Sequence, residues 1–237
     1  MAKKKSKRIM LKFSGEVLKG KNDDSVDFVK LEKLAKQVKA ISKKMGVVMV
    51  IGGGNIWRYR DNKGKGIPRV ESDFMGMMAT VMNGVAMQAV LERLGVSCRV
   101  MSALPVAEIA EPYIRRKALD HLENGRVVIC AGGTGRPFFT TDTAAALRAL
   151  ELDCDILLKA TKVDGVYDKD PEKHKNAKKY KSITFDEVIK KRLAFMDVTA
   201  STLCREGELG VVVFDLMKKG NLAAAAAGKK VGTCVHN

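Results

Sequence analysis

The stretch VVMVIGGGN, at residues 47–55, runs five apolar residues directly into three glycines. An uninterrupted apolar run of this length is typical of a strand that is buried on both faces, as in a parallel sheet. Three glycines after such a strand expose consecutive backbone N–H groups, and groups of this kind can bind a phosphate. For one isolated segment, a flexible turn is the alternative interpretation.

Strand-like and helix-like segments alternate along the whole chain, which predicts an α/β three-layer sandwich with a mostly parallel central sheet and helices on both faces. We expect a single domain at residues 9–237, after a basic tail at residues 1–8. A helix at residues 28–45 is predicted to end at Gly46 and to bury Phe28, Leu31, Leu34, Val38, Ile41 and Met45. A longer helix at about residues 73–94 is predicted to direct inward Met75, Met78, Met82, Val85 and Val90.

The 237-residue chain carries 43 Lys and Arg against 27 Asp and Glu, a formal net charge of +16. Such an excess favours polyanionic partners, either nucleotides or nucleic acid, although a solvated basic surface is also consistent with it. The sequence has no zinc-finger spacing, aromatic RNA-binding signature or basic zipper, so we expect no specific nucleic-acid partner.

Cysteine usage and hydropathy indicate a cytoplasmic protein without a metal centre of its own. The cysteines are widely spaced and form no C-x-x-C pair, which argues against a zinc site and a disulfide framework. We expect no segment to approach the roughly 20 apolar residues of a membrane helix. The apolar stretch after the basic N-terminus is too short for a secretory signal.

Three predicted strands end in glycine-containing corners, at residues 13–16, 52–55 and 132–135. If all three open on the same edge of the sheet, they form one groove lined with backbone donors. A groove of this kind could hold the phosphates of two ligands at once, which phosphoryl transfer between nucleotides requires.

Three cations are predicted to lie near these corners. Lys12 precedes the first corner, Arg58 follows the second, and Lys159 ends a predicted strand at the same edge. The sequence has no P-loop, no convincing dinucleotide fingerprint and no protein kinase motif set, so these side chains would have to neutralise the phosphates.

The segments KFSGE, GGGNIWR, DFMGMMATVMNG, AGGTGRPFFTTDTAAALRA and KATKVDGVYDKDP together resemble bacterial UMP kinases, within the amino acid kinase fold. The resemblance runs from about Lys12 to the C-terminal strand. It implies transfer of the γ-phosphoryl group of ATP to UMP with Mg²⁺, in pyrimidine nucleotide biosynthesis, by a homohexamer assembled from dimers.

The resemblance also implies roles for individual residues. The catalytic set would be Lys12, Arg58, Asp142 and Lys159. ATP would be bound by Lys12, Phe13, Ser14, Gly15, Gly54, Arg58, Thr161, Tyr167 and Asp170. UMP would be bound by Gly53, Asp73, Thr134, Gly135, Arg136, Pro137, Phe138, Phe139, Thr140 and Thr141.

Several of these residues also have a structural interpretation. Asp142 could be a helix N-cap, or it could orient a lysine or a metal-bound water, and both can hold together. Phe138 and Phe139 either belong to the core or form the wall of a pyrimidine site. Asp73 either accepts hydrogen bonds from the UMP ribose or is simply an acid at a helix start.

Two other functions remain open at this point. A kinase of the same fold that acts on a carboxylate or carbamate would share the glycine corners, but it would not explain GRPFFTTD. A basic nucleic-acid-binding protein would explain the net charge, but not the corners.

Overall fold

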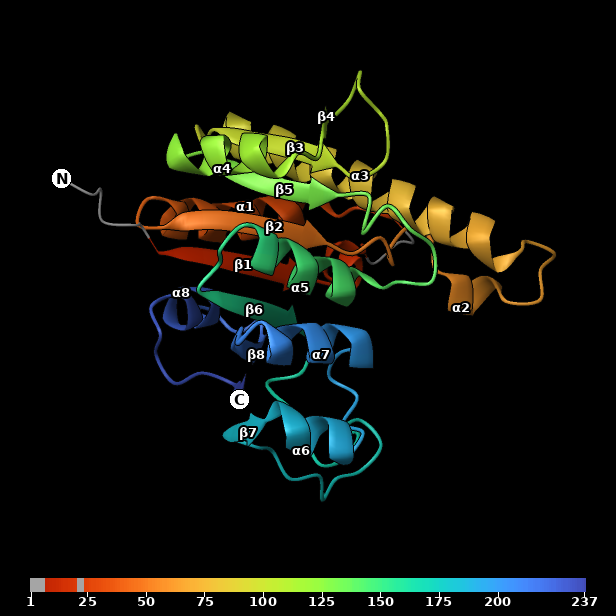
Figure 1. Ribbon diagram of the computed structural model, residues 1–237, viewed down its shortest axis with the longest axis vertical. Helices are drawn as coiled ribbons and strands as arrows, with labels where there is room; N and C mark the ends of the chain where they lie inside the picture. Colours follow the sequence, from red (N-terminus) through yellow and green to blue (C-terminus); the bar gives the residue numbers. More distant parts are fainter. Residues whose placement is uncertain (1–6, 21–23) are drawn as a thin grey trace.

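The computed structural model describes residues 7–20 and 24–237, and Figure 1 shows a central sheet with helices on both sides. Within the described residues the sheet has nine strands in the order β4-β3-β5-β2-β1-β6-β8-β9-β7. Neighbouring strands are parallel except β8 and β9. The strands are β1 (Arg8–Phe13), β2 (Gly46–Ile51), β3 (Cys98–Ser102), β4 (Glu111–Pro112), β5 (Val127–Ala131), β6 (Ile156–Thr161), β7 (Ser182–Thr184), β8 (Val211–Asp215) and β9 (Thr233–His236).

Two apolar layers enclose this sheet, which confirms the predicted three-layer sandwich. The first layer packs against α1 (Phe28–Ser42), α3 (Arg69–Arg93) and α8 (Asn221–Ala226). The second packs against α4 (Arg115–Glu123), α5 (Thr141–Glu151), α6 (Phe185–Lys190) and α7 (Val198–Glu206). Alternate residues of one strand enter opposite layers, as Leu11 and Met10 of β1 do. The short helices η1 (Gly15–Leu18) and α2 (Tyr59–Asn62) follow β1 and β2.

Helix ends follow the local sequence. Asp27 caps α1 by accepting hydrogen bonds from the amides of Val29 and Lys30, at 2.9 and 3.1 Å. α1 ends at Ser42, so the predicted end at Gly46 is wrong, since Gly46 already begins β2. Phe28, expected in the core, is 67% exposed because it is the first residue of the helix.

The apolar face predicted for α3 is wrong at four of its five residues, and Val90 alone of the five is buried as expected. Met75, Met78, Met82 and Val85 are exposed, whereas Met77, Val81, Met87, Val90 and Leu91 are buried against the sheet. This helix is apolar around most of its circumference, so periodicity alone does not select the side that faces the sheet. The side that faces the sheet is the one that carries small residues. A Cβ on Gly84 would lie only 3.3 Å from Val100 of β3, so the absence of a side chain lets the helix approach the sheet closely.

α3 also corrects the expectation about membrane-spanning length, since residues 74–91 carry no charged side chain. By length and composition alone, this helix could cross a membrane. Half of the apolar window is buried inside the fold, and the core helix of a soluble protein has the same composition. One such helix is therefore only weak evidence for a membrane protein.

The N-terminal strand begins inside the segment expected to be a tail. Arg8 is the first residue of β1 and is buried, with its amide donating to Asp155 at 2.7 Å and its guanidinium to the Leu152 carbonyl at 3.2 Å. Residues 1–6 of the expected tail lie outside the described residues.

The strand order reverses next to β1. The chain continues from β1 to β2 on one side, whereas β6 lies on the other side of β1 and leads to β8. In parallel sheets such a reversal leaves a crevice at the carboxyl ends of the strands, where ligands bind. Lys12 and Lys159 are register partners across β1 and β6 at this point.

Gly53 permits the close approach of α3 to the second corner, which predicts that Gly53→Ala destabilises the fold. A Cβ at Gly53 would lie 2.6 Å from the Gly76 carbonyl oxygen and 2.9 Å from the Ala79 Cβ. We expect a loss of about 1–3 kcal/mol in the free energy of unfolding, measured by urea denaturation.

Gly76→Ala is the matched control, because a Cβ there meets nothing within 4 Å. Alanine is about 1 kcal/mol more favourable than glycine inside a helix, so this variant should be as stable as the parent or more stable. Equal stability of the two variants would contradict the close-approach argument.

Candidate active site

The three glycine corners lie together at one edge of the sheet, as the sequence predicted. A Cβ on Gly15 would lie 2.3 Å from the Gly52 carbonyl oxygen, so only glycine allows the first two corners to touch. A Cβ on Gly52 would in turn lie 3.5 Å from the Thr141 hydroxyl, at the start of α5. Gly133 of the third corner lines the same cavity as Gly52.

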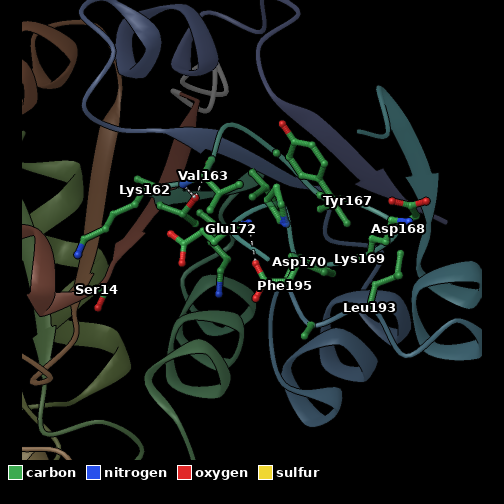
Figure 2. A pocket seen from close by; sticks show the side chains of 18 of the residues that line it. Ser14, Lys162, Val163, Tyr167, Asp168, Lys169, Asp170, Glu172, Leu193 and Phe195 are labelled. Atoms are coloured by element: carbon green, nitrogen blue, oxygen red, sulfur yellow. Dashed lines mark hydrogen bonds between the residues drawn. The ribbon is translucent and has the colours of Figure 1, made fainter. Parts of the chain in front are cut away.

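Two cavities open at this edge and meet at Ser14, which lines both. The larger has a volume of about 650 Å³ and lies between β6 and the segment before α7 (Figure 2). The smaller has a volume of about 340 Å³ and lies over the glycine corners and the start of α3. The two cavities therefore adjoin at Ser14.

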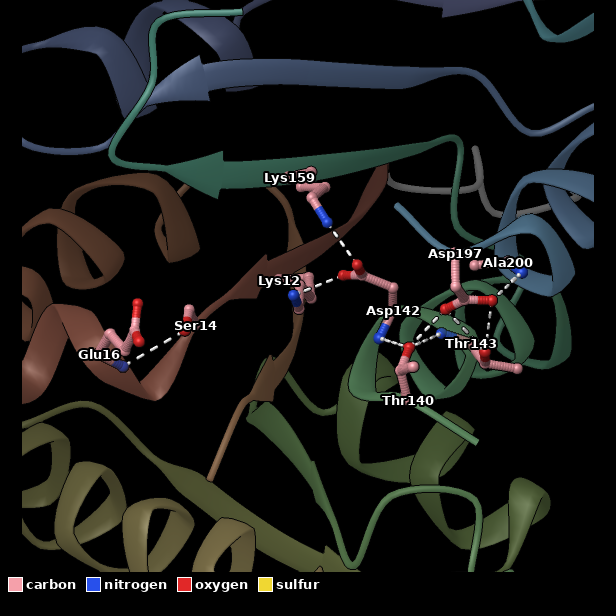
Figure 3. Close-up of polar contacts among 9 residues, drawn as sticks. All are labelled: Lys12, Ser14, Glu16, Thr140, Asp142, Thr143, Lys159, Asp197 and Ala200. Atoms are coloured by element: carbon pink, nitrogen blue, oxygen red, sulfur yellow. Dashed lines mark hydrogen bonds and ion pairs between the residues drawn. The ribbon is translucent and has the colours of Figure 1, made fainter. Parts of the chain in front are cut away.

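A buried carboxylate bridges the two register-paired lysines behind these cavities (Figure 3). Asp142 Oδ1 lies 2.5 Å from the Lys12 ammonium, and Oδ2 lies 2.5 Å from that of Lys159. Burial by itself would raise the pKa of Asp142, but the charges of Lys12 and Lys159 outweigh burial and lower the pKa to about 2. The carboxylate is therefore ionised and keeps two like charges side by side.

The ammonium of Lys159 is less strongly basic than an exposed lysine. Burial lowers its pKa, the neighbouring Lys12 charge lowers it further, and Asp142 only partly compensates, so that the pKa is about 8. Lys159 is thus charged at neutral pH and loses its proton in mildly alkaline solution.

The start of α5 aims Asp142 at the lysines. Thr140, not Asp142, is the N-cap, since its hydroxyl accepts from the Asp142 and Thr143 amides at 3.0 and 3.3 Å. Asp142 contacts both lysines, and that it orients them stays a prediction, whereas its expected role as N-cap is wrong. Asp197 caps α7 and also accepts from the Thr140 and Thr143 hydroxyls, so it ties α7 to α5 (Figure 3).

Two further supporting residues escaped the sequence analysis. The side-chain amides of Asn55 and Asn83 donate to one another's oxygens at 3.0 and 2.7 Å, and Asn83 also donates to the Gly52 carbonyl at 2.7 Å. Both are buried, and they fasten the second corner to α3. The sequence signal for Asn83 was its place within an apolar helix, because a buried polar side chain requires a hydrogen-bond partner.

The structure divides the expected nucleotide contacts between the two cavities. The larger is lined by the expected ATP residues Lys12, Ser14, Thr161, Tyr167 and Asp170, together with Lys159. The smaller is lined by the expected UMP residues Gly53, Asp73, Thr134, Arg136, Phe139, Thr140 and Thr141. Gly54 and Arg58, expected with ATP, line this smaller cavity instead.

The remaining expected contacts surround these cavities. The Phe13 side chain is fully buried in the core, so only its backbone faces the first corner. Gly15 packs against Gly52, as described above. Gly135, Pro137 and Phe138 belong to the loop before α5.

That loop is fastened to α3 through Asp73. The Asp73 carboxylate accepts from Arg69 Nε at 2.8 Å and from the Phe138 amide at 2.8 Å. Phe138 has a φ of 71° and an exposed side chain, and Phe139 is exposed as well, so the core interpretation of these aromatics is wrong. The Phe139 ring lines the smaller cavity and can contact a flat ligand, whereas the Phe138 ring faces the Arg69 guanidinium, which lies 5.6 Å from the ring centroid.

Comparison with known proteins agrees with this architecture. Residues 7–215 match the Amino acid kinase family. The chain belongs to the amino acid kinase family. Within this family it is similar to the UMP kinase from Ureaplasma parvum, with 38% identity, a TM-score of 0.94, and coverage of 99% of this chain and 100% of that one. The UMP kinase from Bacillus anthracis is similar at 36% identity and a TM-score of 0.94, covering 98% and 97%.

The uridylate kinase from Archaeoglobus fulgidus, at lower identity, shares the fold. It has 24% identity and a TM-score of 0.76, with coverage of 96% of this chain and 99% of that one. The family match across the corners favours a kinase over a basic nucleic-acid-binding protein, because net charge alone would not require this arrangement.

The buried lysine pair predicts that Asp142→Asn destabilises the protein. Without the carboxylate charge, two buried ammonium groups face each other uncompensated. Removal of one partner from a buried ion cluster costs about 3 kcal/mol or more in the free energy of unfolding. Urea denaturation at pH 7 measures this loss.

The control replaces the whole cluster, as Lys12→Met, Asp142→Leu and Lys159→Met in one chain. Apolar replacement of a complete buried ion cluster is often neutral or stabilising, so this variant should unfold near the parent's midpoint. An Asp142→Asn protein that is as stable as the parent would show that the lysines do not depend on this charge.

Proposed function

We propose that this kinase transfers the γ-phosphoryl group of ATP to a phosphate oxygen of UMP, giving UDP and ADP. The observation that carries the proposal is the meeting of two cavities at Ser14, beside two buried lysines and three glycine corners. The similarity to UMP kinases over the full chain supports the choice of acceptor. We also propose that the protein works in the cytoplasm, in pyrimidine nucleotide biosynthesis.

The sizes and lining residues of the cavities support one arrangement of substrates. ATP, the larger nucleotide, would occupy the 650 Å³ cavity, with its base and ribose near Thr161, Tyr167 and Asp170. UMP would occupy the 340 Å³ cavity between Asp73 and Phe139. The phosphates of both would then approach Ser14.

Charge neutralisation and alignment would supply the catalysis. A phosphate oxygen of UMP is already ionised at neutral pH, so the reaction needs no strong general base. Lys12 and Lys159 would stabilise the charge on the moving phosphoryl group, while Asp142 keeps them in place. Arg58 would contribute a planar fork for phosphate oxygens from the smaller cavity.

Mg²⁺ would enter with the nucleotide. Among the described residues, no three His, Cys, Asp or Glu side chains are grouped to hold a metal, and both oxygens of Asp142 face lysines. A Mg²⁺ ion would then be held mainly by the phosphate oxygens of ATP and by water. The Ser14 hydroxyl, which lines the larger cavity, would lie beside it. When bound, the metal would neutralise phosphate charge.

A coupled assay of ADP formation tests the function and the role of Lys12. We expect turnover with UMP, much weaker turnover with CMP and dTMP, and none with aspartate, glutamate or carbamate. Lys12→Ala should lower kcat about 100-fold or more in a folded protein, because it removes a cation from the transferring group. Preference for a carboxylate or carbamate would reject UMP as the acceptor.

The pKa of Lys159 predicts a decline of activity in alkaline solution. The protonated form neutralises phosphate, so kcat/KM for ATP should fall as the pH rises through about 8. Lys159→Arg should have lower activity overall, but its decline should begin at higher pH, because a guanidinium keeps its proton. If the activity of Lys159→Arg declined at the same pH as that of the parent, the decline would be due to another group.

We further propose that copies of this chain pair through α3 and assemble into a homohexamer. The exposed side chains Met75, Met78, Met82, Val85 and Ala89 recur at alternating three- and four-residue steps, which is the spacing of a helix–helix seam. Such a stripe can pair with the same stripe of a second copy about a two-fold axis, and this would cover apolar surface that a soluble monomer leaves exposed.

Met82→Glu tests this assembly. Met82 is 59% exposed at the middle of the stripe, so a charge there should reduce the mass observed by sedimentation velocity. Met217→Glu is the matched control, since Met217 is 62% exposed but lies outside α3. Equal masses for the two variants and the parent would reject α3 as the contact.

A further inference from the structure

Glu16 lies between two cations that belong to different cavities. Its Oε1 is 2.6 Å from Arg58 Nη1, and its Oε2 is 3.9 Å from the Lys162 ammonium. Glu16 and Lys162 line the larger cavity, whereas Arg58 lines the smaller one. The three residues follow β1, β6 and β2, so the contact exists only because the carboxyl ends of these strands meet.

Stability does not account for this carboxylate. The Glu16 side chain is 37% exposed and Lys162 more so, and exposed ion pairs contribute little to folding. A negative charge beside two phosphate-binding cavities also repels their ligands. The backbone that carries it is held in place, since the Glu16 amide donates to the Ser14 hydroxyl at 3.3 Å (Figure 3).

The Arg58 guanidinium is held against the second glycine corner, where we expect phosphate to bind. Its guanidinium fills the space that a Cβ on Gly54 would occupy, with Nη2 at 2.5 Å and Nε at 2.9 Å from that point. One edge of the fork therefore lies against the glycine corner, and Glu16 covers Nη1. A phosphate that binds Arg58 at Nη1 therefore takes the place of the carboxylate.

We propose that Glu16 is an internal competing anion that couples the two cavities. In the empty enzyme its carboxylate pairs with Arg58 and Lys162, and the phosphates of a bound nucleotide displace it into solvent, toward which it is already partly exposed. The first nucleotide bears the cost of this displacement, and the second does not. Each nucleotide therefore strengthens binding of the other by the same factor. The inference rests on the proposed binding of two nucleotides.

Calorimetric titration without turnover tests the coupling. UMP and a non-transferable ATP analogue are titrated separately and then each in the presence of the other, at constant Mg²⁺, with the parent and with Glu16→Gln. In the parent, each ligand should bind several-fold tighter when the other is present. In Glu16→Gln, each ligand alone should bind several-fold tighter than in the parent, and the mutual enhancement should disappear.

Glu172→Gln is the matched control for a general change of charge. Glu172 also lines the larger cavity, and its backbone amide donates to Asp170. This variant should retain the mutual enhancement, whatever its effect on binding of the ATP analogue alone.

Three outcomes would overturn the inference. Weaker binding of UMP to Glu16→Gln would make Glu16 a support for Arg58 rather than its competitor. Weaker binding of the analogue that extra Mg²⁺ restores would make Glu16 a metal ligand. Mutual enhancement that persists in Glu16→Gln would place the coupling elsewhere. Failure of the parent to bind either nucleotide would instead reject the proposed function.

Discussion

The contact of Asp142 with Lys12 and Lys159 is the interaction on which the site depends. Two lysines at paired positions of adjacent strands would repel each other in the buried layer, and the carboxylate at 2.5 Å from each compensates them. The arrangement requires α5 to begin beside the ends of β1 and β6. The Thr140 cap and Asp197 secure that position, so the electrostatics of the site rest on how two helices start.

The second constraint on the site is the close approach of the glycine corners to one another and to α3. Gly15, Gly52 and Gly53 lie where a Cβ would meet neighbouring backbone or the α3 helix, and the Asn55–Asn83 pair fastens the corner that they form. The absence of side chains at these positions therefore lets the strand ends and α3 pack closely together. The Arg58 guanidinium then occupies the space beside Gly54, and Glu16 pairs with it at the junction of the two cavities.

Much of this arrangement could be predicted from local patterns. Apolar runs ending in glycine predicted the strands and their common edge, and Lys12 and Lys159 followed from their positions at strand ends. Other features had no local signal. The exposed methionines of α3 were predicted to be buried, because a helix that is apolar on all sides has no preferred face. The cavity that Arg58 lines could not be predicted either, because a long side chain can turn either way from its backbone.

The sequence by itself determined the alternation of strands and helices, the three glycine corners and the excess of cations, because these depend on residues adjacent in the chain. Only the tertiary structure decided which side chains each carboxylate contacts. Asp142 pairs with lysines from β1 and β6, Asp197 reaches α5 from α7, and Glu16 joins cations that follow β2 and β6. Such pairs join residues far apart in the chain, and their distances depend on how the strands are ordered in the sheet, which periodicity does not encode.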